Sequence, residues 1–240
     1  MTPEIAEIWV YLSASPLLWL SATLIAYVVA DALSARLDRH PLANPVVIAA
    51  AVLVGLLAVT QTPYPTYFDG AQFVHFMLGP ATVALAVPLY RNIRLVRRSL
   101  LPMATALLAG SITAAASAVG IAWLFGAPGE VLASLAPKSV TAPIAMELAR
   151  DLGGIASLTA VLVVATGIIG AIIVTPLMNA LKIKNFAARG FAAGVASHGI
   201  GTARAFQVSE LAGTFAGIAM GLNGALTSLL VLLWIFAAGY

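Results

Sequence analysis

Long stretches without a charged side chain alternate with short charged loops along this chain. Six such stretches are Ile8–Ala30, Pro41–Phe68, Gly70–Tyr90, Ser99–Gly129, Leu152–Leu181 and Leu211–Tyr240. A helix needs about 20 mainly apolar residues to cross the roughly 30 Å of a bilayer's hydrocarbon core. Each stretch is at least that long, so the pattern predicts a series of transmembrane helices.

Two further segments are apolar but interrupted by ionisable residues. Val131–Ala149 contains Lys138 and Glu147, and Gly190–Gln207 contains His198 and Arg204. The loops between these stretches are too short to form a soluble domain. The sequence therefore predicts one all-α integral membrane domain with about seven transmembrane helices and a re-entrant or broken hairpin.

The composition agrees with this class and excludes others. Hydrophobic residues make up 61% of the 240 residues and charged residues only 9%, whereas a soluble domain has about 25% charged residues. A soluble enzyme, a nucleic-acid-binding protein and a disordered chain are excluded. The chain has no cysteine and none of the common nucleotide-binding or zinc-protease motifs. We therefore expect no enzymatic activity, no cofactor, no metal site and no nucleic-acid partner.

The basic residues predict an orientation in the cytoplasmic (inner) membrane. Arg36 and Arg39, the segment 91–98 and the segment 182–189 form three basic loops. Cytoplasmic loops carry an excess of Lys and Arg. All three loops lie on the cytoplasmic side only if residues 127–150 leave and re-enter on the outer side.

The same spacing predicts an internal repeat. The expected domain order is an N-terminal helix (1–42), a first repeat (43–126), a re-entrant segment (127–150) and a second repeat (151–240). Helices near 43–60, 71–90 and 99–125 would correspond, in opposite orientation, to helices near 155–178, 190–206 and 211–238. Inverted three-helix repeats with interrupted helices are the plan of many secondary transporters. Three shorter parallel units remain an alternative.

Three segments combine helix-breaking residues with hydroxyl groups. They are GPATVALAVP (79–88), PKSVTAPIAME (137–147) and SHGIGTAR (197–204). Proline removes a backbone donor, and the backbone groups freed by a break in lipid must face protein or a water-filled cavity. Three such breaks predict a polar cavity inside the bundle.

The side chains of these breaks suit a small anion. Half-helix N-termini carry partial positive charge, hydroxyls donate hydrogen bonds, Arg grips a carboxylate through two bonds, and Lys adds a point charge. The candidate substrate-binding residues are Thr82, Lys138, Ser139, Thr141, Ser197, Thr202, Arg204 and Asn223. Glu147 and His198 are candidates for proton coupling, because both exchange protons.

Structural explanations compete with each of these roles. Lys138 and Arg204 can extend to the membrane interface, Glu147 can pair with Arg150 or Lys138, and Asn223 can face another helix. Glycine recurs at every fourth position in 213–221, a spacing that permits close helix packing either inside the fold or in a dimer.

Several long motifs resemble one known family. The stretches GPATVALAVPLY (79–90), PKSVTAPIAMEL (137–148), GGIASLTAV (153–161), TGIIGA (166–171) and ARGFAAGVASHGIGTARA (188–205) are similar to those of LrgB/CidB membrane proteins. The resemblance implies holin- or antiholin-like modulators of murein hydrolase activity that work with a small LrgA/CidA-type partner. It also implies transport, because a plastid relative exchanges glycolate and glycerate, and some bacterial members are linked to pyruvate uptake.

Two functions follow as expectations. The first is a secondary transporter of small monocarboxylates such as glycolate, glycerate or pyruvate, coupled to protons or sodium. The alternative is a holin- or antiholin-like modulator of autolysis. In either case we expect the lipid bilayer as the environment, an LrgA/CidA-type partner, and a homodimer, which is the commonest closed assembly.

Overall fold

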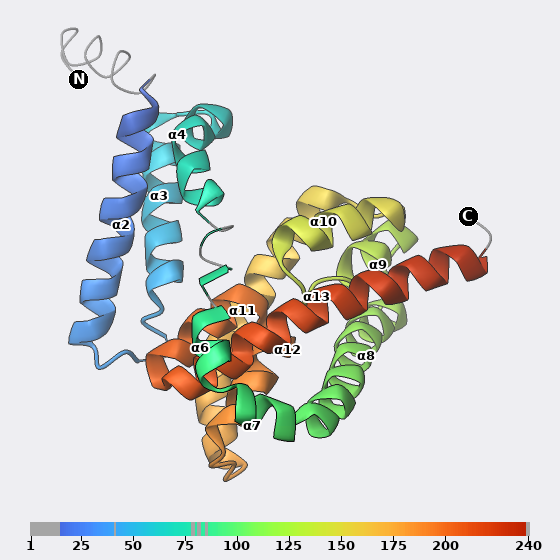
Figure 1. Cartoon of the computed structure of the whole chain (residues 1–240). Helices are drawn as coiled ribbons and strands as arrows, with labels where there is room; N and C mark the ends of the chain where they lie inside the picture. The colour runs from blue at the N-terminus through green and yellow to red at the C-terminus, as the bar shows by residue number, and fades with distance from the viewer. Residues whose placement is uncertain (1–14, 41, 78–79, 81–82, 85, 239–240) are drawn as a thin grey trace, which may run out of the picture. The chain divides into compact units, whose positions relative to one another are not determined.

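Every regular element that the structure describes is a helix (Figure 1). This computed structural model describes residues 15–40, 42–77, 80, 83–84 and 86–238. The helices are α2 (Pro16–Arg36), α3 (Pro45–Thr60), α4 (Tyr64–Phe76), α6 (Ala86–Arg91), α7 (Ile93–Arg98), α8 (Leu100–Leu124), α9 (Gly129–Leu135), α10 (Ala142–Asp151), α11 (Ala156–Ala180), α12 (Phe186–Val208) and α13 (Glu210–Ala238). The predicted all-α class is confirmed.

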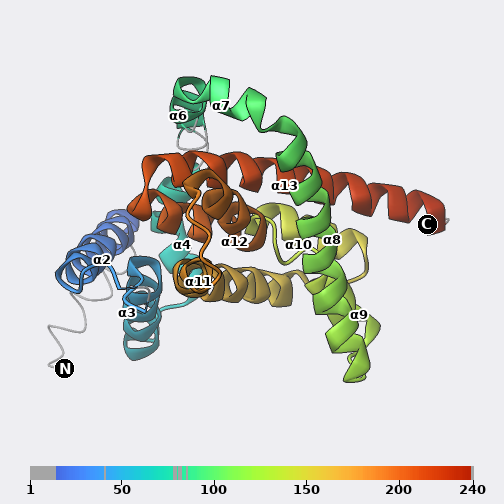
Figure 2. The same ribbon diagram turned by 90° about the horizontal axis from the view of Figure 1, so that it is seen from below.

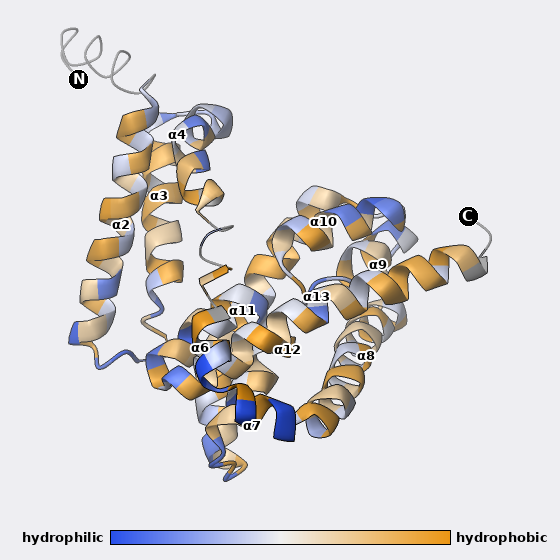
Figure 3. Ribbon diagram, in the orientation of Figure 1, coloured by the Kyte–Doolittle hydropathy of each residue, from blue (hydrophilic) through white to orange (hydrophobic). Residues whose placement is uncertain are grey.

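Four of the described helices are long and apolar enough to cross a membrane: α2, α8, α11 and α13. Figure 3 shows mainly apolar residues along these helices, whereas the short helix α7 alternates apolar residues with strongly hydrophilic ones. The chain is thus built as a multi-pass membrane protein. The count of about seven transmembrane helices and the inverted repeats stay predictions.

The chain forms two units, Met1–Ala84 and Leu85–Tyr240. Their boundary falls within the predicted first repeat (43–126). It also falls in the first predicted break, where α4 ends at Phe76 and α6 begins at Ala86. Residues 78–79, 81–82 and 85 of this break lie outside the described residues, so the helix expected over 71–90 stays a prediction.

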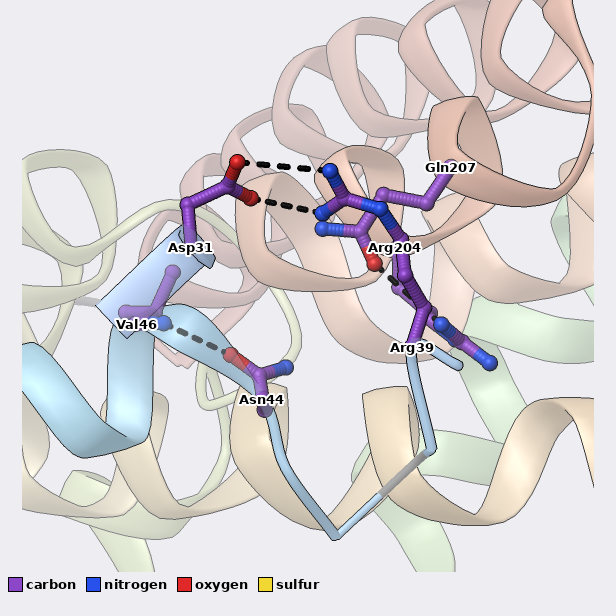
Figure 4. A network of polar contacts seen from close by, with 6 residues as sticks. All are labelled: Asp31, Arg39, Asn44, Val46, Arg204 and Gln207. Carbon is purple, nitrogen blue, oxygen red and sulfur yellow. Dashed lines mark hydrogen bonds and ion pairs between the residues drawn. The ribbon is translucent and has the colours of Figure 1, made fainter. Parts of the chain in front are cut away.

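In the first unit, α2 packs against both α3 and α4. The close approach of α2 to α4 depends on Gly70, where a Cβ would lie 2.1 Å from the Pro16 carbonyl oxygen. At the other end of α2, Arg39 in the following loop binds Asp31 at 2.6 Å (Figure 4). The Asp31 carboxylate, which accepts a hydrogen bond from Arg39, raises the pKa of Arg39 above its ordinary value, so Arg39 stays charged at physiological pH.

In the second unit, α12 packs against α8, α11 and α13, and α8 crosses α13 (Figure 2). The backbones of α12 and α13 approach closely through two α12 glycines. A Cβ at Gly190 would lie 1.9 Å from the Ala212 carbonyl oxygen, and one at Gly194 would lie 2.1 Å from that of Ala216. Only glycine fits at these two positions.

We expected the regularly spaced glycines of α13 to allow close helix packing, and the structure confirms this only in part. Gly213 packs inside the unit, because a Cβ there would lie 2.2 Å from the Phe206 ring, but Gly221 has no neighbour within 4 Å of such an atom. The α13 face that meets the α12 backbone is instead made of Ala212 and Ala216. The spacing predicted close packing correctly, but the glycines that allow it lie on α12.

The segment 127–150 forms two short helices joined by residues 136–141. With 7 and 10 residues, α9 and α10 are about 10 and 15 Å long at 1.5 Å per residue, so neither crosses a bilayer alone. The pair is attached to α11 through Ser134, whose hydroxyl accepts a hydrogen bond from the Ile155 amide at 2.8 Å. Thr159 then donates to the Ser134 carbonyl at 3.2 Å. This geometry fits a broken hairpin.

Candidate functional site

Helix α12 is interrupted at His198, inside the third predicted break. His198 has φ 41° and ψ −132°, which is not helical. A positive φ is uncommon for a residue with a side chain, so the surrounding packing must hold it. His198 and the neighbouring Ser197 are both buried, at 5% and 1% exposure. The predicted break at 197–204 is confirmed.

The interrupted turn of α12 packs against helix α11. The His198 ring Nε2 lies 2.9 Å from the Val163 carbonyl oxygen of α11. Gly167 makes room for that ring, since a Cβ there would lie 2.7 Å from its Cε1 atom. One turn along α11, a Cβ at Gly170 would lie 1.7 Å from the Ser197 hydroxyl oxygen. The TGIIGA run therefore forms the surface against which the break is packed.

Asn223 of α13 joins the second and third breaks. Its side-chain amide donates to the Ser139 carbonyl at 3.1 Å and to the Val195 carbonyl at 3.1 Å. The Ser111 hydroxyl of α8 donates to its Oδ1 atom at 2.6 Å. Val195 lies in the turn before His198, where an interrupted helix leaves carbonyl groups without their usual partners. Asn223, at 1% exposure, thus satisfies carbonyls of both breaks.

A cavity of about 250 Å³ lies beside Asn223, between α8, the 136–140 turn and α13. Its polar lining residues are Ser111, Ser139, Asn223 and Thr227, and its remaining lining is apolar. We call it the Asn223 cavity. Its volume lies just below the range of about 300–1,000 Å³ for ligand pockets, and its few polar groups among apolar walls are typical of a site for a small molecule.

Lys138 and Thr141 lie in the same turn as Ser139. The Lys138 Nζ atom lies 3.5 Å from the Ser139 hydroxyl oxygen. Thr141 precedes the first residue of α10, but its side chain makes no capping hydrogen bond. Lys138 thus brings a positive charge to the region where the two breaks meet.

Thr202 and Arg204 lie on α12 beyond the break. Thr202 is buried and donates to the His198 carbonyl at 2.8 Å, which satisfies a carbonyl at the break itself. Arg204 is 9% exposed and donates to Gln207 at 3.2 Å (Figure 4). It does not line the Asn223 cavity.

Glu147 and Thr82 also fall outside the cluster. Glu147 is exposed on α10 and pairs with Arg150 three residues along, as one of the structural alternatives expected. Thr82 lies outside the described residues. Among the described residues, no group of three or more His, Asp or Glu side chains is placed to hold a metal ion.

Sequence reasoning missed the residues that pack against the interrupted segments or bind their polar groups. Ser111, Gly167 and Gly170 were not candidates, because each is an ordinary membrane-helix residue by itself. The TGIIGA run, which carries part of the family resemblance, could have drawn attention to the two glycines. No local signal pointed to Ser111, which lies 112 positions from its partner Asn223.

The contact between Gly170 and Ser197 gives a first prediction. Gly170→Ala should destabilise the second unit, because overpacking a tight contact costs about 1–3 kcal/mol. Ser197→Gly should partly rescue that variant, because the next nearest atom, the Ser197 Cα, is 3.7 Å from the added methyl carbon. Thermal unfolding of both single variants and the double variant in detergent measures this coupling. Strict additivity of the two single effects would contradict the contact.

Comparisons with known proteins give a consistent result. The chain matches the LrgB-like family over residues 23–236. It is 36% identical to the uncharacterized protein YwbG of Bacillus subtilis, over 85% of this chain and 91% of the relative. It is 30% identical to the holin-like protein CidB of Staphylococcus epidermidis (92% and 95% covered) and 28% identical to that of Staphylococcus aureus (90% and 93%). No solved structure matches it.

Proposed function

Because the chain belongs to the LrgB-like family, we propose that it acts as a holin-like component of the cytoplasmic membrane that modulates murein hydrolase activity and autolysis. The observation that carries this proposal is the name of its CidB relatives, "holin-like protein", at 28–30% identity over at least 90% of this chain. These names favour the holin-like function over the transporter that the sequence patterns suggested first. An LrgA/CidA-type small membrane protein is the partner that this proposal implies.

Transport of a small monocarboxylate is a second candidate, favoured by the Asn223 cavity. A cavity of about 250 Å³ beside two interrupted segments is the arrangement in which transporters bind substrate. A pore that forms by helix association needs no such pre-formed polar site. The two functions are compatible, because a change in metabolite flux can alter autolysis indirectly.

In the transport proposal, the polar groups near the cavity have different roles in binding substrate and coupling ion. Ser139 and Asn223, which line the cavity, would contact the carboxylate. Lys138 would supply positive charge from the same turn, and Thr141 would need to move to reach the substrate. His198 would exchange a coupling proton at the break, or freed carbonyls would bind sodium. Ser197, Thr202, Arg204 and Glu147 lie away from the cavity or face elsewhere, so their predicted roles need movement of α12 or α10.

The predicted inverted repeats belong to the transport proposal, and one contact fits them. They would pair the helix 99–125 with the helix 211–238, which correspond to α8 and α13. Ser111 and Asn223, one from each helix, are hydrogen-bonded to each other. Residues related by a pseudo-two-fold axis meet in this way where they lie close to the axis.

One preparation can distinguish the two functions. The full chain is reconstituted into liposomes that enclose a fluorescent dye larger than the Asn223 cavity, with and without an LrgA/CidA-type partner. Labelled glycolate and pyruvate are supplied outside, with or without an inward proton gradient. We expect the holin-like function to appear as dye release that rises steeply with protein density and shows no substrate saturation.

The opposite pattern identifies the transporter. Saturable uptake with the dye retained would contradict a holin-like pore and support transport, and stimulation by the gradient would identify the proton as coupling ion. Retained dye with no uptake, with and without the partner and with folding confirmed, would contradict both proposals. Empty liposomes and liposomes with heat-denatured protein are the controls.

A further inference from the structure

An apolar groove of about 500 Å³ runs between α8 and α12 in the second unit. Its floor consists of Met103, Phe191, Val195 and Phe215, which are all buried and belong to one hydrophobic cluster. Its α8 wall is made of small residues at every fourth position, Ala106, Gly110 and Ala114. Because these residues lack bulk, they leave an apolar channel open beside the floor. We call it the α8–α12 groove.

One end of this groove is polar, because Ser99 and Asn185 line it. Each of them directly follows an exposed basic residue, Arg98 and Lys184 respectively, which does not itself line the groove. In Figure 3, the hydrophilic helix α7, which ends at Arg98, and the turn between α11 and α12 both lie on the lower side of this unit. The polar end of the apolar groove, which we call its mouth, thus has an exposed basic residue next to it in sequence just before both helices.

We infer that the α8–α12 groove binds one acyl chain of an anionic phospholipid, with the lipid phosphate at the mouth beside Arg98 and Lys184. The apolar channel matches the tail, and the two basic side chains match the head group. Basic residues at the cytoplasmic surface attract anionic lipids. A second copy of this chain would bring the same basic residues to the mouth, where like charges repel.

Native mass spectrometry of the full chain in detergent tests this site. The protein is incubated with phosphatidylglycerol or with phosphatidylcholine of the same acyl chains, and the fraction that retains lipid is measured. We expect phosphatidylglycerol to be retained preferentially, and Arg98→Gln and Lys184→Gln each to lower its affinity on the order of fivefold. Arg36→Gln, which removes an equal charge from the first unit, should leave the preference unchanged.

The channel itself is tested by filling it. Ala106→Trp should reduce the retention of both lipids, whereas Ala104→Trp, on an exposed α8 position that does not line the groove, should not. Ala192→Phe fills the groove from the α12 side and replaces Ala106→Trp in this test if that variant fails to fold.

Three results would overturn the inference. They are equal retention of the two lipids, the same loss in the control variants, and a dimer that Ala106→Trp dissociates while lipid retention is unchanged. The last result would assign the groove to an interface between copies of the chain.

Discussion

Asn223→Leu is expected to destabilise the second unit by about 2 kcal/mol. The substitution removes the three hydrogen bonds that Asn223 makes with Ser111, Ser139 and Val195. Polar contacts between membrane helices contribute about 0.6 kcal/mol each on average. Loss of the partner also leaves the Val195 carbonyl at the α12 break without its donor. Thermal unfolding in detergent, or unfolding by a denaturing detergent, measures the change.

Two further variants separate the effect of the lost hydrogen-bond donor from the effect of a changed side-chain shape. Asn223→Asp keeps the size but replaces the donating amide with an oxygen that faces two carbonyls, so it should destabilise at least as much as Asn223→Leu. Asn179→Leu is the matched control, because Asn179 is an exposed asparagine that accepts one hydrogen bond from Arg189. Wild-type stability in Asn223→Leu would show that Asn223 does not hold the breaks together.

Gly194→Ala should have the other large effect, and it has an internal control. The added methyl carbon would lie 2.1 Å from the Ala216 carbonyl oxygen, and backbone cannot move aside as a flexible side chain does. We expect a loss of about 1–3 kcal/mol or more because α12 and α13 must separate. The same change at Gly221, where nothing lies within 4 Å, should be neutral or stabilise by up to about 1 kcal/mol.

The comparison of these two variants is read from unfolding temperatures measured under identical detergent conditions. Equal effects at both positions would contradict the close backbone approach of α12 and α13. A larger loss at Gly221 would instead indicate that this exposed glycine packs against a second copy or a partner. The pair therefore also tests whether α13 uses its glycines inside the fold or outside it.

The sequence predicted the break in α12 because its cause is local. A histidine between Ser197 and Gly199, followed by Gly201, lowers the preference for a continuous helix within a few residues. The all-α class was predictable for a similar reason, since the length of each apolar stretch is a local property. Neither prediction required knowledge of which helices pack together.

The partners of the break were not predictable, because they come from distant segments. Asn223 was a candidate only as a polar residue in an apolar helix, and its contacts with Ser139 and Val195 depend on the packing of α13. Glu147 had two possible partners in the sequence, Arg150 and Lys138, and the structure pairs it with Arg150. The need for glycine at position 170 could be recognised only from the structure, which places Ser197 against it.

The short connection between α12 and α13 has a consequence for biosynthesis. Helix α12 is not among the four described helices that can cross a membrane by length and composition, yet Ser209 alone separates it from α13. A segment with a buried His and Arg gains little by entering lipid on its own. We therefore expect the ribosome and translocon to deliver the two helices together, as a hairpin whose second, apolar arm carries the first into the bilayer.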